Sequence, residues 1–237
     1  MAQPDHPPIR DAATIILLRG GPEAPSVLMG QRGSGAVFMP NKVVFPGGAV
    51  DPGDHAVELA GLPAAPCLDR LSEGIKPPLP QALLAAAIRE VWEETGLILG
   101  RAGHWPDAPA DWQGFAATGH IPDASALRFV FRAITPPGNK RRFDARFFLA
   151  DASAACSSDL DDFSAASDEL SNLQWIPLAE VRDFDLPFIT QVVLAEIAVL
   201  LRDGAERPAT VPFFFNDAEQ SLFRRLNGRS PLAGNDA

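Results

Sequence analysis

The segment over residues 81–95 constrains the fold of this chain more than any other. Its apolar residues Leu84, Ile88 and Val91 recur at the helical period, so they lie on one face. Gly96 follows directly, where a glycine ends a helix by adopting a left-handed backbone conformation. The pattern predicts a helix over residues 81–95 that packs its apolar stripe against a core.

The last two turns of this helix carry three glutamates on one face. Glu90, Glu93 and Glu94 stand at positions i, i+3 and i+4. Carboxylates held this close repel one another, and a divalent cation removes that cost; magnesium prefers such oxygen ligands. Arg89 lies one turn before Glu93, where it can orient that carboxylate or bridge to a neighbouring loop. The spacing therefore predicts a magnesium site.

A row of glutamates on a helix is usually a solvated face, and two features favour the metal site here. The acids lie at the C-terminal end of the helix, where the helix dipole disfavours anions. They also follow the turn Phe45-Pro46-Gly47-Gly48, whose glycines let the backbone pass close to another group.

Strand and helix patterns alternate irregularly along the chain, which favours an α/β fold with a mixed sheet flanked by helices. Apolar runs between turn residues predict strands over residues 12–19, 26–32, 127–134, 143–149 and 170–176. Residues 97–99 are a further candidate strand start, and residues 213–215 a buried strand or lid anchor. Helical patterns predict helices over residues 187–202 and 218–226, and a short helix over residues 67–72. Residues 101–126 are expected to be rich in loops.

The acidic composition excludes some partners. The chain has 237 residues and a formal net charge of −10, so broad binding to nucleic acid is not expected. Residues 140–142 with Arg146 are the candidate basic cluster for an anionic substrate, although residues 140–142 alone also fit a solvated hairpin tip. The two cysteines do not form a metal-spaced pair and suit a reducing cytoplasm. No signal-peptide pattern or long apolar run occurs, so we expect a cytoplasmic protein without a membrane span.

Residues 48–97 resemble the Nudix box, whose helical half reads Arg-Glu-apolar-x-Glu-Glu-x-Gly-apolar, here REVWEETGL. The resemblance implies one Nudix domain over residues 1–237, an α/β/α sandwich with a mixed sheet. Its core would span residues 10–183, with an insertion over residues 55–80. A C-terminal helical extension, residues 184–237, would cover a substrate pocket or form a homodimer contact.

The resemblance also implies a hydrolase that cleaves a diphosphate linkage in a nucleoside diphosphate derivative, with Mg²⁺ as cofactor and Mn²⁺ as its substitute. Glu90, Glu93 and Glu94 would ligate the metal, and Arg89 would orient them. The residues expected to contact the substrate are Arg32, Phe45, Gly47 and Gly48.

The box is interrupted in this chain. The usual box places a glutamate six residues after its glycine and eight residues before its arginine. Counting from Gly48 gives Asp54, whereas counting back from Arg89 gives Gln81, about 27 residues further on. The insertion falls in the loop before the helix, so the metal site need not be harmed. The first acidic position is filled by Asp54 or Gln81, or is absent.

A general base in this family is often supplied from a loop outside the box. Glu169, six residues before Trp175, has the arrangement that many members show, with Asp168 as a close substitute. The alternative is an ordinary acid of a surface loop.

The lead-in to the box is similar to that of the coenzyme A diphosphatases. Arg32 lies thirteen residues before Phe45, as an arginine does in that subgroup. Val37 and Asn41 stand where the subgroup has a second arginine and a glycine. Coenzyme A or an acyl derivative is the leading substrate expectation, and nucleoside-diphosphate sugars and dinucleotides stay open.

Aromatic side chains offer a ring for a bound base or belong to the core: Phe38, Trp105, Trp112 and Phe115. Two other functional classes stay as alternatives for the whole chain. One is a Nudix-like sensor that binds a nucleotide without cleaving it, which the intact Arg89 and three glutamates argue against. The other is a helical interaction module with an acidic surface.

Overall fold

The computed structural model describes residues 7–204, 208–216 and 221–227. Within these residues, nine strands form one mixed sheet in the order β11-β10-β7-β8-β1-β2-β3, with β4 paired to β1 and β9 paired to β2. These strands are β1 (Ile9–Arg19), β2 (Ser26–Arg32), β3 (Val43–Val44), β4 (Gly47–Ala49), β7 (Arg128–Ile134), β8 (Arg142–Asp151), β9 (Leu170–Pro177), β10 (Val211–Asn216) and β11 (Ser221–Leu226). The pairs β1–β8 and β7–β10 are parallel, and the other pairs are antiparallel.

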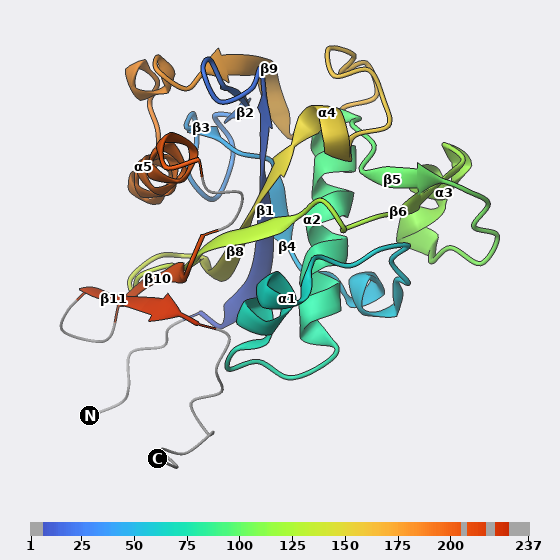
Figure 1. Cartoon of the computed structure of the whole chain (residues 1–237), viewed down its shortest axis with the longest axis horizontal. Helices are drawn as coiled ribbons and strands as arrows, with labels where there is room; N and C mark the ends of the chain where they lie inside the picture. The colour runs from blue at the N-terminus through green and yellow to red at the C-terminus, as the bar shows by residue number, and fades with distance from the viewer. Residues whose placement is uncertain (1–6, 205–207, 217–220, 228–237) are drawn as a thin grey trace.

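Helices cover both faces of this sheet (Figure 1). They are α1 (Ala65–Ser72), α2 (Leu79–Thr95), α3 (Gln113–Ala117), α4 (Ala152–Ala155) and α5 (Phe188–Arg202), with short 3₁₀ helices η1 (Pro52–Ala56), η2 (Ala110–Trp112) and η3 (Val181–Asp183). Alternation along β1 assigns the two faces: Ile15 belongs to the core cluster of α2, and Ile16 to that of α5. The structure thus confirms the predicted α/β/α arrangement around a mixed sheet.

The central strand β1 changes partner along its length. Its end, Leu18 and Arg19, pairs with β2, whereas Ala12 to Thr14 pair with β4. The amide of Ile15 donates to the carbonyl of Pro46 at 3.0 Å, just before β4 begins. This exchange places the two glycines of β4 against β1 and brings them to the C-terminal half of α2.

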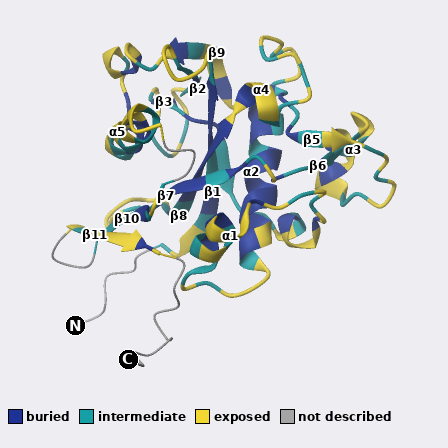
Figure 2. Cartoon of the chain, in the orientation of Figure 1, coloured by how far each residue is buried: buried dark blue, intermediate teal, exposed yellow. Residues whose placement is uncertain are grey.

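Helix α2 is more deeply buried than its predicted apolar stripe suggested. Residues 82–88 all have an exposed fraction of 0%, and Figure 2 shows the helix as buried over most of its length. Part of the cover comes from the insertion, because α1 packs against α2 and β7. Cys67 and Leu71 of α1 are buried in the same cluster as α2. The insertion thus completes the core on the outer side of α2, and its predicted short helix is confirmed within two residues.

The C-terminal part corrects one prediction. The helix expected over residues 218–226 is wrong: residues 221–226 are strand β11, and residues 217–220 lie outside the described residues. Phe214 pairs with Phe223 in the β10–β11 ladder, so this segment is held by strand pairing that a local helical pattern does not reveal. The extension therefore adds one helix, α5, and a β-hairpin that widens the sheet. The strand predicted at residues 213–215 is confirmed as half-buried β10.

Two smaller differences lie in the segment after α2. Leu97 and Leu99 are buried core residues rather than the start of a strand, and the strand β5 (Gly100–Ala102) begins after them. It pairs with β6 (His120–Pro122) in a separate two-stranded sheet within the predicted loop-rich region. None of the described helices is long and apolar enough to span a membrane.

Candidate active site

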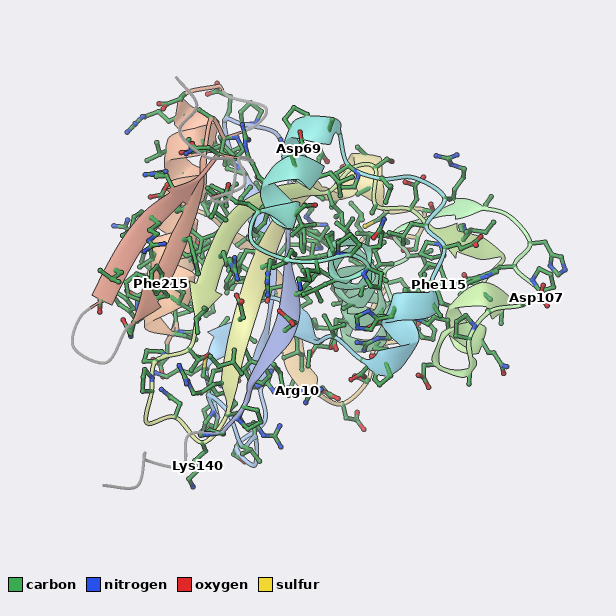
Figure 3. The ribbon with its side chains drawn as sticks, turned by 90° about the horizontal axis from the view of Figure 1, so that it is seen from below. Arg10, Asp69, Asp107, Phe115, Lys140 and Phe215 are labelled. Carbon is green, nitrogen blue, oxygen red and sulfur yellow. The ribbon has the colours of Figure 1, made fainter. Side chains whose placement is uncertain are left out.

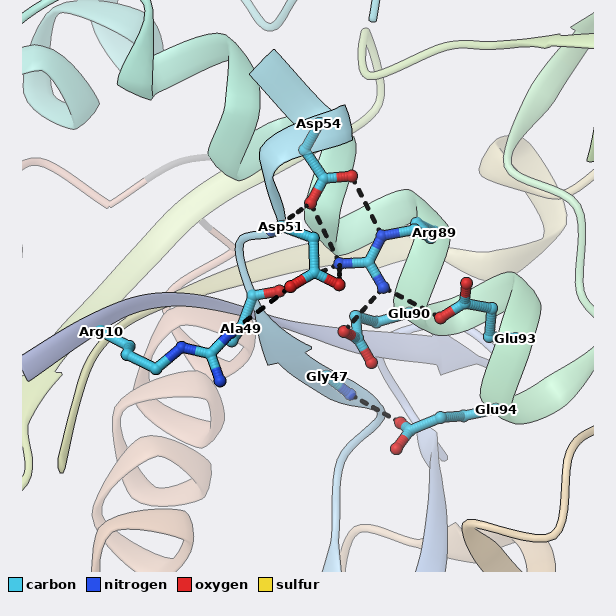
Figure 4. A network of polar contacts seen from close by, with 9 residues as sticks. All are labelled: Arg10, Gly47, Ala49, Asp51, Asp54, Arg89, Glu90, Glu93 and Glu94. Carbon is cyan, nitrogen blue, oxygen red and sulfur yellow. Dashed lines mark hydrogen bonds and ion pairs between the residues drawn. The ribbon is translucent and has the colours of Figure 1, made fainter. Parts of the chain in front are cut away.

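Arg89 is the centre of a polar network between the end of α2 and the β4–η1 segment (Figure 4). Its Nη1 donates to Glu90 and to Glu93, each at 2.9 Å. Its Nη2 donates to the carbonyl oxygen of Ala49 at 2.9 Å, so the guanidinium joins the helix to the strand. Burial lowers the pKa of Arg89, but its hydrogen bond to Asp54 and the charges of the neighbouring carboxylates outweigh this and raise that pKa overall. Arg89 therefore stays charged and holds Glu90 and Glu93 in place.

Asp54, and not Gln81, lies against Arg89. Nε and Nη2 of Arg89 donate to the two oxygens of Asp54, each at 3.0 Å. Asp54 is 1% exposed, whereas Gln81 is exposed in the first turn of α2. The amide of Asp51 also donates to Asp54 at 2.8 Å, which fixes the carboxylate on η1. Asp54 precedes the inserted residues in sequence. Arg89 therefore has its acidic partner on the segment that directly follows β4, and the insertion does not separate the two.

The two glycines of β4 allow the glutamates to approach the strand backbone. The amide of Gly47 donates to Oε2 of Glu94 at 2.8 Å. A Cβ atom on Gly48 would lie 2.3 Å from Oε1 of Glu90, inside contact distance. Glycine is thus required at position 48 so that the carboxylate of Glu90 can pack there.

Burial makes ionisation of the helical carboxylates costly. It is the main cause that raises the pKa of Glu90 to about 7, although Arg89 opposes the shift. It also raises the pKa of Glu94 to about 8, with the charge of Glu90 adding to the shift, and it raises the pKa of Glu93. A cation bound beside these oxygens would remove this cost.

Arg32 and Phe45, both predicted to contact substrate, have different surroundings. The charge of Arg32 lowers the pKa of Glu94, so its guanidinium lies on the side of the site where Glu94 is found. Its Nε is buried and has no hydrogen-bond partner among the described residues. A buried donor left unpaired is costly, and an anionic ligand would satisfy it. Phe45 is 4% exposed and packs in the core beneath α5.

Glu169 lies at the end of the loop that precedes β9 and is exposed. Its charge raises the pKa of both Glu90 and Glu94, which places it within electrostatic range of both. The amide of Ser167 donates to the carbonyl oxygen of Glu93 at 2.8 Å, so the loop is attached to the end of α2. The structure therefore brings Glu169 to the glutamates from a distant part of the sequence.

The donor set suits a hard divalent cation. Glu94 is buried, Glu90 is partly buried, and both have raised pKa values; carboxylate oxygens are the ligands that magnesium prefers. In the part of the chain that the structure describes, no three His, Cys, Asp or Glu side chains are already gathered as a metal cage. Arg89 instead holds Glu90 and Glu93 around one guanidinium nitrogen, and the amide of Gly47 holds Glu94.

The proposed basic cluster does not form. Lys140 projects from the β7–β8 hairpin (Figure 3) and is exposed, which is the hairpin-tip alternative. Arg146 is 1% exposed and pairs with Asp11 and Asp144, while Arg132 also binds Asp144. These charges neutralise one another inside the sheet–α2 layer and are not placed for a substrate.

The aromatic residues considered for base stacking pack against other rings. Trp112 and Phe115 are fully buried, Trp105 packs on Trp112 with a centroid distance of 5.7 Å, and Phe38 meets Phe143 edge-on at 5.3 Å. Two cavities, of about 330 and 370 Å³, lie elsewhere, one between α5 and β10 and the other between α1 and β7. Neither cavity is lined by the residues of the polar network around Arg89.

Comparison with known proteins agrees with this geometry. The chain is 31% identical to the acyl-coenzyme A diphosphatase NUDT19 of Gallus gallus, over 59% of this chain and 54% of that protein. It is 30% identical to the putative nudix hydrolase 7 of Caenorhabditis elegans, over 73% of this chain and 53% of that protein. The chain thus spans about half the length of these curated relatives. No family model matches the sequence.

The fold matches that of a solved structure. The NUDIX hydrolase of Alicyclobacillus acidocaldarius superposes with a TM-score of 0.62 at 27% identity, covering 85% of this chain and 99% of that one. The sequence and fold similarities confirm the resemblance that the box predicted.

Proposed function

We propose that this chain, a relative of the Nudix hydrolases in sequence and fold, is a magnesium-dependent hydrolase of a diphosphate linkage in a nucleoside diphosphate derivative. One observation carries the proposal. Buried Arg89 ties the end of α2 to Asp54 of η1 and to the carbonyl of Ala49 in β4, and it binds Glu90 and Glu93 on the side of the site where Gly47 binds Glu94. A purely structural helix end gains nothing from three carboxylates whose pKa values are raised by burial.

The three glutamates would hold Mg²⁺, or Mn²⁺ in its place. The bound ion would supply Lewis-acid polarisation of the diphosphate and a more acidic water. Arg89 orients Glu90 and Glu93 by donating to both, and the amide of Gly47 orients Glu94. These contacts limit the freedom of the carboxylates before any ligand arrives.

Two further residues complete the proposed reaction. Arg32 binds an oxygen of the diphosphate through its unpaired Nε–H. Glu169 accepts a proton from the attacking water, whose oxygen forms a bond to one phosphorus. The bond from that phosphorus to the bridging oxygen breaks, and the bridging oxygen leaves on the second phosphate. The exposure of Glu169 and its electrostatic reach to Glu90 support this role.

Coenzyme A or an acyl-coenzyme A is the substrate class we propose first. The similarity to the acyl-coenzyme A diphosphatase of Gallus gallus supports it, as does the spacing of Arg32, thirteen residues before Phe45. Nucleoside-diphosphate sugars and dinucleotides share the diphosphate that Arg32 would bind, so they belong in the same test.

The test is product release from a panel of coenzyme A, acetyl-coenzyme A, ADP-ribose, NADH, a UDP-sugar and nucleoside triphosphates, first with Mg²⁺ and then with EDTA. Cleavage of the coenzyme A compounds that EDTA abolishes would support both the activity and the substrate class. The panel is then repeated with Glu93→Gln, which changes one of the three proposed metal ligands. Its matched control is Glu180→Gln, which changes an exposed glutamate of the turn before η3. Tight binding of a panel member without cleavage would instead support the sensor reading.

A further inference from the structure

The loop over residues 156–169 carries Glu169 from α4 to the start of β9, and it is attached at both ends. At its first end, the amide of Ser157 donates to the carbonyl of Ile98 at 2.8 Å, and Ser158 Oγ accepts from the amide of Ile98 at 3.1 Å. Near its last end, the amide of Ser167 donates to Glu93. A Cβ atom on Gly96 would lie 3.1 Å from that of Ala165, so the loop passes directly over the end of α2.

The middle of the loop is held by a different pair of side chains, Arg19 and Trp175. The indole Nε1 of Trp175 donates to the carbonyl oxygen of Leu160 at 2.9 Å. The guanidinium of Arg19 lies over the Trp175 ring, 4.5 Å from its centroid, and donates to Asp161 at 2.6 Å. We call these contacts the Arg19–Trp175 clasp.

The hydrogen bond from Trp175 to Leu160 closes a loop of the backbone that contains Glu169. Leu160 and Trp175 are 15 residues apart, and Glu169 lies between them, directly before the first residue of β9. Trp175 is itself fixed because β9 pairs with β2, where Trp175 faces Leu28. The clasp therefore ties the loop before β9 to a strand of the sheet, which reduces the conformations open to Glu169.

We propose that Trp175 and Arg19 are positioning residues for Glu169. They act through the carbonyl oxygen of Leu160 and the side chain of Asp161 and not through the substrate. This inference rests on the proposed role of Glu169 as general base. A loop attached only at its ends would leave the approach of Glu169 to Glu90 and Glu94 variable, and small displacements of a catalytic group are costly to rate.

The test combines two substitutions in a double-mutant cycle. Trp175→Phe removes the indole N–H but keeps an aromatic ring beneath Arg19. We expect it to lower kcat about tenfold, while KM and the Mn²⁺ affinity measured by titration change less than about twofold. In a Glu169→Gln background, the same substitution should change kcat by less than about twofold, because the group that the clasp positions is already absent.

Controls separate this role from a general loss of fold. Trp105→Phe makes the same change in the half-buried tryptophan that packs on Trp112, and its kcat should match that of the wild type. Asp161→Asn weakens the clasp from its exposed side, so it tests the same contact even if Trp175→Phe folds poorly. This variant should also have a lower kcat than the wild type. Thermal unfolding checks that each variant is folded.

Two outcomes would overturn the inference. One is full activity of Trp175→Phe and Asp161→Asn. The other is an equal loss of kcat from Trp175→Phe in both backgrounds, which would mean that the clasp acts through something other than Glu169. If the wild-type protein turned over no diphosphate, the proposed function would be overturned together with the inference that rests on it. If the wild type is active and one of the two outcomes above is found, the inference alone is overturned, so the two failures are distinguishable.

Discussion

Arg89 and Asp54 form a bidentate ion pair with both N–O distances at 3.0 Å and with side chains 5% and 1% exposed. The pair joins α2 to η1 across the insertion, and it is the contact on which the orientation of the glutamates depends. Removing the Asp54 carboxylate leaves Nε and one N–H of Nη2 of Arg89 buried without an ionised acceptor, which is far more costly than the net value of the pair itself.

Asp54→Asn should therefore lower the free energy of unfolding by about 3 kcal/mol. Denaturant unfolding with a matched Asp51→Asn variant measures this, because Asp51 is 48% exposed and lies 3.7 Å from Arg89. The Asp51 substitution should cost less than about 1 kcal/mol. Equal losses in the two variants would contradict the special role of Asp54.

Gly48→Ala should destabilise the protein and reduce turnover together. The added Cβ would lie 2.3 Å from Oε1 of Glu90, so the carboxylate or β4 must move, at a cost of about 1–3 kcal/mol. Gly33→Ala is the matched control, because a Cβ there meets nothing within 4 Å. Unfolding midpoints and kcat of both variants check the prediction, and a Gly48→Ala protein with wild-type values would contradict the close approach.

Glu94→Gln should lower kcat by a factor of about a hundred or more while leaving the fold intact. The pKa of Glu94 is raised to about 8, so in the metal-free protein its carboxyl is mostly neutral at pH 7, as glutamine is. Turnover and the unfolding midpoint are measured for Glu94→Gln, Glu93→Gln and the Glu180→Gln control. An active protein carrying both Glu93→Gln and Glu94→Gln would rule out the metal-site assignment.

The stability of the metal-free protein should fall as pH rises from about 5 to about 8. The folded pKa values of Glu90 and Glu94, about 7 and about 8, lie above the value of about 4.5 of an unfolded glutamate. In this range the folded state binds more protons than the unfolded state, so a rise in pH favours unfolding. Urea midpoints at several pH values, in EDTA and in Mg²⁺, check the slope.

Magnesium should flatten that slope, because it favours the ionised carboxylates in the folded state. The protein carrying both Glu90→Gln and Glu94→Gln should show a smaller slope in EDTA than the wild type. A wild-type slope that persists unchanged in this variant would assign the pH dependence to other groups.

The central helix and its acidic face were predictable because their pattern is local. The period of Leu84 and Ile88 and the cap at Gly96 are properties of neighbouring residues, and the helix lies within two residues of its predicted start. The choice between Asp54 and Gln81 was not predictable, since it depends on how η1 returns to α2 in space. The ion pair of Arg146 with Asp11 likewise depends on a strand neighbour distant in sequence.

The strand at residues 221–226 is a second case in which the local sequence pattern did not predict the structure. Its pairing with β10 comes from tertiary context, which outweighs local helical preference. The clasp of Arg19 and Trp175 also joins segments far apart in sequence, and no local pattern predicted it.

The inserted residues begin after Asp54 and end at the start of α2. The contacts of Arg89 with Asp54 and with the carbonyl of Ala49 therefore lie outside the insertion. The entropy of closing a loop grows only slowly with its length, by about 0.6 kcal/mol for each doubling. Residues added to the exposed turns of this segment should therefore leave the geometry of the carboxylates in place, whereas loss of α1 would uncover the core side of α2 that Cys67 and Leu71 pack against. The surface that the insertion presents can thus be extended without rebuilding the chemistry beside it.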